Sequence, residues 1–169
     1  MAYDVTIDHI HNMKTDGVIP GNEGHKKIRM YVVSRKEAES YVPTPGIMSV
    51  CISLWDKTVS DAPAKISGMF QDVLYLEFDD TEEVGPEMAG WPPEILYNDA
   101  LADQVAEFVN KYIDTAQVLV IHCFAGINRS RSMSSAIAKH FDLPYKWSVG
   151  NALVYDTTLA ALQRYKKPE

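Results

Sequence analysis

Cys123 and Arg129 are the two residues whose types and spacing most directly indicate chemistry. They follow an apolar run at 118–121, which predicts a buried strand, and active sites of open α/β sheets lie at the carboxyl ends of strands. Gly126 gives the loop between them the freedom to curl with its N–H groups inward. A helix starting near Arg129 adds further donors, and the guanidinium can grip two phosphate oxygens. The segment predicts a site for a tetrahedral oxyanion above a nucleophilic thiolate.

Such a site also needs a proton for the leaving oxygen. Asp79 and Asp80 end a predicted strand at 73–78, so they are expected at the same sheet edge as Cys123. We expect one of the two to be the acid and the other to be an ordinary turn residue. Successive side chains of a strand point to opposite faces, and this alternation favours Asp80 as the acid.

The rest of the chain predicts the elements that position these groups. Apolar, β-rich runs predict four strands, at 28–33, 47–54, 73–78 and 118–121. Apolar residues at helical spacing, together with prolines that end helices, predict four helices, at 35–41, 94–113, 132–141 and 152–165. Ser34 and Glu37 form a capping box before the first helix. The alternation predicts a single α/β domain with a central, mostly parallel sheet flanked by helices on both faces, comprising a loop-rich segment at 1–27 and a core at 28–169.

Composition narrows the class of partner. The 169 residues include 23 acidic and 16 basic side chains, a net charge of −7, which argues against general nucleic-acid binding and against docking on anionic lipid. Two cysteines are too few for a disulfide scaffold and indicate a reducing compartment. No segment has the pattern of a signal peptide or a membrane span, so we expect a cytoplasmic protein.

The segment His122-Cys123-x5-Arg129-Ser130 resembles the signature of the cysteine-dependent protein tyrosine phosphatases. The short chain and the upstream acid are similar to the dual-specificity branch. The phrase Leu76-Glu77-Phe78-Asp79-Asp80-Thr81-Glu82 resembles compact bacterial and phage-type members.

This resemblance implies hydrolysis of phosphate monoesters through a cysteinyl-phosphate intermediate, without metal or cofactor. Cys123 would be the nucleophile, Ser130 would ease its departure, and His122 would brace the loop and help to hold the thiolate. Asp80, or else Asp79, would be the general acid. Phosphoryl oxygens would be bound by the Arg129 side chain and the loop amides of Phe124, Ala125, Gly126, Ile127, Asn128 and Arg129. A phosphotyrosine protein or peptide is the first substrate expected, with phosphoserine or phosphothreonine as further options.

Departures from the family pattern leave alternatives open. Asn128 stands where many members have Gly or Ser, and RNA 5′-triphosphatases of the superfamily often have Asn there. An RNA or nucleotide 5′-phosphatase is therefore one alternative, and a catalytically weak phosphate-binding module is another. Residues 81–93 lengthen the chain between acid and nucleophile and suggest an added lid. At the end of this stretch, Trp91-Pro92-Pro93-Glu94 is similar to the Trp-Pro-Asp acid loop of tyrosine-specific members, which makes Glu94 a rival acid. Asp80 is preferred because it ends a strand, whereas Glu94 is predicted to open a helix.

Two further sets of residues have simpler interpretations. Cys51 is expected to be a packed strand residue, although some relatives protect the nucleophile with a second cysteine. His9 and His11 form a His-x-His pattern that is weak as a metal signal, and a solvated segment is expected instead.

Overall fold

The computed structural model describes residues 28–83, 85 and 94–169 of the chain, so the predicted segment 1–27 lies outside the described residues. Four strands form one sheet in the order β1-β4-β2-β3, and every neighbouring pair is parallel. The strands are β1 (Arg29–Ser34), β2 (Ser49–Trp55), β3 (Asp72–Glu77) and β4 (Val118–Cys123). The predicted parallel α/β sheet is confirmed, and it is parallel throughout these four strands.

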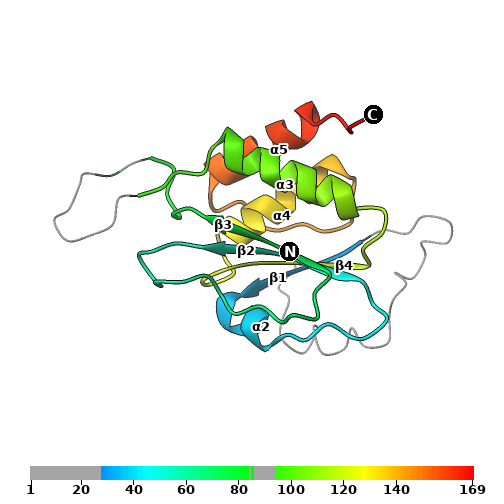
Figure 1. Cartoon of the computed structure of the whole chain (residues 1–169). Helices are drawn as coiled ribbons and strands as arrows, with labels where there is room; N and C mark the ends of the chain where they lie inside the picture. Colours follow the sequence, from blue (N-terminus) through cyan, green and yellow to red (C-terminus); the bar gives the residue numbers. More distant parts are fainter. Residues whose placement is uncertain (1–27, 84, 86–93) are drawn as a thin grey trace.

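Helices cover both faces of the sheet, as predicted (Figure 1). They are α2 (Arg35–Ser40), α3 (Asp99–Tyr112), α4 (Arg129–His140) and α5 (Ala152–Arg164). In Figure 1, α2 lies on one face and the other three helices lie together on the opposite face. Each face has its own apolar core, which agrees with the need of a parallel sheet to be buried on both sides. In the part of the chain that is described, no helix is long and apolar enough to cross a bilayer.

The two central strands explain why the site forms where it does. All six residues of β4 are buried, and six of the seven in β2 are buried. Because all strands run the same way, their carboxyl ends meet at one edge of the sheet. β4 ends there at Cys123, β2 at Trp55 and β3 at Glu77, so the residues that follow these three ends come together.

Most predicted elements lie within a few residues of their observed positions. Ser34 caps α2 as predicted, because its Oγ accepts a hydrogen bond from the Glu37 backbone N–H at 3.2 Å. The α4 helix begins at Arg129, which agrees with the helix start expected near that residue and extends the range predicted at 132–141. Cys123 and the helix are therefore joined by only five residues.

The predicted helix at 94–113 begins late. The α3 helix starts at Asp99, because Asn98 caps it by accepting a hydrogen bond from the Leu101 backbone N–H at 3.1 Å. Ahead of it, Ile95 bonds with Asp79 instead of with a following helical turn: its N–H donates to the Asp79 carboxylate, and its carbonyl accepts from the Asp79 N–H. The sequence interpretation counted Ile95 as helical because it is spaced correctly with later apolar residues.

Candidate active site

The Cys123 sulfur lies at the carboxyl end of the buried strand β4 and has two hydrogen-bond partners. Its Sγ is 3.1 Å from Ser130 Oγ on the first turn of α4, and it accepts from the Gly126 N–H at 3.2 Å. The side chains of Cys123 and Ser130, predicted to act together, are in contact.

The loop at 123–129 curls because Gly126 adopts a backbone φ of +73°, which side chains rarely allow. A Cβ at this position would also lie 2.7–2.8 Å from backbone atoms of Val33 and Ser34 in β1. Two loop carbonyls are bound from outside the loop: Phe124 O accepts from the Arg35 N–H and Gly126 O from Arg131 Nε. On the cysteine side of the loop, the Gly126 N–H donates to the Cys123 sulfur.

Arg129 is only 4% exposed, and a buried carboxylate binds its side chain. Its Nη1 donates to Asp56 Oδ2 at 2.7 Å and to the Phe78 carbonyl at 2.8 Å. Asp56 is in turn bound by the backbone N–H and the hydroxyl of Thr58. The Nε of Arg129 is buried without a hydrogen-bond partner among the described residues. A buried unpaired donor is costly, so this N–H is suited to an oxygen of a bound ligand.

His122 is fully buried behind the loop, in a network that determines its tautomer. Its Nδ1 lies 3.1 Å from the Cys123 carbonyl, and its Nε2 lies 2.6 Å from Ser53 Oγ. Because a carbonyl can only accept, Nδ1 carries the proton and Nε2 accepts from the Ser53 hydroxyl. Burial lowers the pKa of His122 to about 4, so the ring is neutral at pH 7. His122 therefore contacts the Cys123 backbone through Nδ1 and carries no positive charge at pH 7.

Asp79 and Asp80 both line the pocket above the cysteine, with different surroundings. Asp79 is 8% exposed; its Oδ2 accepts from the Ile95 N–H at 2.6 Å, and burial raises its pKa despite this bond. Asp80 is exposed, and its two oxygens accept from two side-chain amides, Asn128 Nδ2 at 3.0 Å and Asn151 Nδ2 at 3.1 Å. Both carboxylates reach the site, as the parallel topology predicts.

The pocket at this edge has a volume of about 390 Å³. Its floor and walls come from the loops that follow β2, β3 and β4. The lining residues that bear on the chemistry are Asp56, Asp79, Asp80, Glu94, Cys123 and Arg129, and those of the apolar rim are Val59, Phe124 and Ile127. Glu94 accepts from the Gly85 N–H at 2.8 Å and precedes α3 without belonging to it. The argument that set Glu94 aside, its place at a helix start, is therefore wrong.

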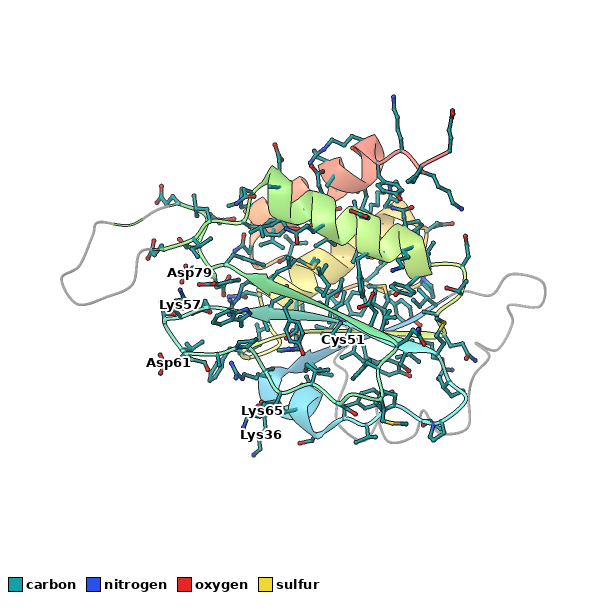
Figure 2. The ribbon with its side chains drawn as sticks, viewed as in Figure 1. Lys36, Cys51, Lys57, Asp61, Lys65 and Asp79 are labelled. Carbon is teal, nitrogen blue, oxygen red and sulfur yellow. The ribbon has the colours of Figure 1, made fainter. Side chains whose placement is uncertain are left out.

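Cys51 is too far from Cys123 to protect it. In the β2–β4 register Cys51 is opposite Val120, three residues before Cys123, which at about 3.3 Å per residue is roughly 10 Å. A disulfide needs Cα atoms within about 7 Å. Figure 2 shows Cys51 within the sheet and Asp79 at its end, and both cysteines are free. The packed-strand interpretation of Cys51 is confirmed, and the protecting-partner interpretation is wrong.

Three residues of the site were missed by the sequence interpretation, namely Ser53, Asp56 and Asn151. Asp56 follows the end of β2 just as the acid pair follows β3, and this was the available signal. Asn151 precedes the predicted helix at 152 and could have been identified as its cap. Ser53 carried no signal. Trp91, Pro92, Pro93, His9, His11 and most of the predicted lid lie outside the described residues.

Comparisons with known proteins do not identify the chain. A scan against protein-family models finds no match, and searches of curated proteins and of solved structures also find none. Within the described residues, no group of three or more His, Cys, Asp or Glu side chains is arranged to hold a metal ion.

Proposed function

We propose that this protein is a phosphatase that hydrolyses phosphate monoesters through a cysteinyl-phosphate intermediate. The observation that carries the proposal is the pairing of Cys123 with Arg129. The sulfur accepts hydrogen bonds at the base of a pocket, and the neighbouring guanidinium is buried with its Nε unpaired. A nucleophile under a cationic, amide-lined cup is suited to attack on phosphorus.

The chemistry divides into two displacements. In the first, the Cys123 thiolate attacks phosphorus, an S–P bond forms as the bond to the leaving oxygen breaks, and an aspartic acid protonates that oxygen. Arg129 and the loop amides stabilise the charge on the three remaining oxygens. In the second, the aspartate takes a proton from water, the water oxygen bonds to phosphorus, and the S–P bond breaks. Inorganic phosphate leaves, and the Ser130 hydroxyl donates to the departing thiolate.

We propose Asp80 as the acid and base, with Asp79 as the alternative. The loop exposes Asp80 to a substrate, whereas Asp79 is largely buried. The raised pKa of Asp79 nonetheless favours its protonated form, which is what an acid needs. The test below therefore includes both.

The pocket rim supports an aryl phosphate monoester, such as phosphotyrosine in a protein, as the substrate. Val59, Phe124 and Ile127 are 48–53% exposed around the pocket and offer apolar surface to an aromatic ring. Of the charged residues lining the pocket, four are acidic and Arg129 is the cation. Further phosphates on a nucleotide or an RNA 5′ end would be repelled there. We propose that the protein acts on phosphoproteins in the cytoplasm.

The test measures hydrolysis of p-nitrophenyl phosphate, a phosphotyrosine peptide and an RNA 5′-triphosphate, with EDTA present. We expect wild-type activity on the first two, on the acid side of neutrality, where thiolate and protonated aspartate coexist. Cys123→Ser should be inactive yet bind the peptide. In Asp80→Asn the rate of hydrolysis should fall roughly 100-fold or more. Cys51→Ala is the matched control and should stay active.

Other outcomes choose between the alternatives. An inactive wild type that still binds phosphopeptide would indicate a phosphate-binding module. Preference for the triphosphate would indicate the nucleotide 5′-phosphatase. Full activity in Asp80→Asn would move the proton donor to Asp79 if Asp79→Asn loses activity, or to Glu94 if Glu94→Gln loses activity.

A further inference from the structure

Three polar side chains from separate elements meet beside the pocket. Asp80, in the loop after β3, accepts from Asn128 at the start of α4 and from Asn151 at the start of α5. We propose that Asn151 is a positioning residue that holds Asp80 in place for proton transfer. This inference rests on the proposed function and adds a residue that the signature loop does not contain.

The orientation of the Asn151 amide follows from its partners. Its Oδ1 accepts from the Val154 N–H at 3.1 Å, which caps α5, and its Nδ2 donates to Asp80 Oδ1. A backbone N–H can only donate and a carboxylate can only accept, so the amide cannot be flipped without losing both bonds. Asn151 is 2% exposed, and its own N–H donates to Ser132 Oγ on α4 at 3.0 Å. The donor is therefore held rigidly where Asp80 needs it.

Asn128 provides the second hold on Asp80. It stands at the N-cap of α4, yet its side chain makes no capping bond and donates instead to Asp80. Gly150 packs against it so closely that a Cβ there would lie 2.3 Å from Asn128 Oδ1. The segment before α5, the loop at 123–129 and the loop after β3 that carries Asp80 (the acid loop) are thus packed together at one point.

A second bond ties the same acid loop to α5. Glu82 Oε1 accepts from the Ala152 N–H at 2.6 Å, in the first turn of the helix. Because this bond joins the loop to α5 independently of Asn151, losing the Asn151 amide should leave the loop in place and remove one of the two hydrogen bonds that hold the Asp80 carboxylate. Proton transfer depends strongly on such orientation, since displacement of about 1 Å can cost roughly 100-fold in rate.

Asn151→Ser separates this role from the capping role. Serine is as good an N-cap as asparagine, so α5 and the unfolding midpoint should be preserved, but its hydroxyl is too short to reach Asp80. We expect kcat/KM, which reports the first displacement alone, to fall roughly 10- to 100-fold for phenyl phosphate, which has a poor leaving group. KM should change little. For 2,4-dinitrophenyl phosphate, which needs little protonation to leave, the fall should be less than about 3-fold.

Asn98→Ser is the matched control, because Asn98 caps α3 through the same type of bond and does not line the pocket. It should retain wild-type rates on both substrates. In an Asp80→Asn background, adding Asn151→Ser should cause no further loss, since the two residues act as one unit.

Equal losses on both leaving groups, wild-type rates in Asn151→Ser, or an additive loss in the double variant would each overturn the positioning role. A wild type inactive on every monoester would overturn the proposed function instead, and the two failures are distinguishable.

Discussion

At the scale of single residues, the site separates two neighbouring carboxylates by their surroundings. Asp79 is desolvated and has one backbone donor, whereas Asp80 is exposed and has two amide donors. Burial raises the pKa of Asp79, whereas Asp80 is open to solvent. This contrast in burial and in hydrogen-bond partners distinguishes the proposed acid from its alternative. It makes the two Asp→Asn variants the most informative pair of substitutions in this protein.

His122 should make the stability of the fold depend on pH. Its pKa is about 4 when folded, lowered by burial, against 6.5 when unfolded, so between these values the unfolded chain binds more protons. The stabilisation is therefore complete above pH 6.5 and is lost as the pH falls towards 4. A difference of this size corresponds to about 3 kcal/mol. Urea unfolding at several pH values from 7.5 to 4 measures it.

Asp79 has the opposite effect on the pH dependence of stability. Its pKa is raised in the folded state, so it stabilises the fold as the pH falls. Asp79→Asn should therefore steepen the acid-side loss, and His122→Gln should flatten it. An acid-side loss of equal steepness in His122→Gln and in wild type would contradict this assignment.

At the scale of elements, the β4–loop–α4 unit depends on Gly126. Gly126→Ala would place a methyl group against the β1 backbone and strain a positive φ. We expect destabilisation of about 1–3 kcal/mol and a loss of activity of roughly 100-fold, because the loop amides would move. Thermal unfolding and p-nitrophenyl phosphate kinetics measure these two effects.

Gly46 offers a matched control. It has a φ of +83° but nothing within 4 Å of an added Cβ, and it precedes β2 at the opposite edge of the sheet from the site. Gly46→Ala should cost about 1 kcal/mol with activity unchanged. Similar activity in the two variants would mean that the close approach to β1 is unimportant.

At the scale of the whole molecule, an overall charge of −7 surrounds a site proposed for a dianion. The attraction is local, supplied by Arg129, the loop amides and the start of α4, and it acts over contact distances that salt screens weakly. The repulsion is long-range and is screened beyond about 8 Å at physiological salt. Binding of a phosphopeptide should therefore depend on the charge of its flanking residues.

We expect kcat/KM for a phosphotyrosine peptide with acidic flanks to rise severalfold as salt increases from low to physiological levels. For the same peptide with lysine flanks it should fall. Steady-state kinetics with the two peptides at matched ionic strengths measures this. Parallel responses of the two peptides would show that the surface charge does not steer the substrate.

The sequence by itself determined the parts of this protein that depend on local order along the chain. The alternation of strands and helices, the Ser34 cap and the loop joining Cys123 to Arg129 are short-range patterns, so they could be predicted. The tertiary structure decided which distant groups meet. Asp56 reaches Arg129, Asn151 reaches Asp80, and Ile95 pairs with Asp79 instead of continuing a helix. These contacts follow from strand order and register, which bring the carboxyl ends of β2, β3 and β4 to one edge and which no local pattern specifies.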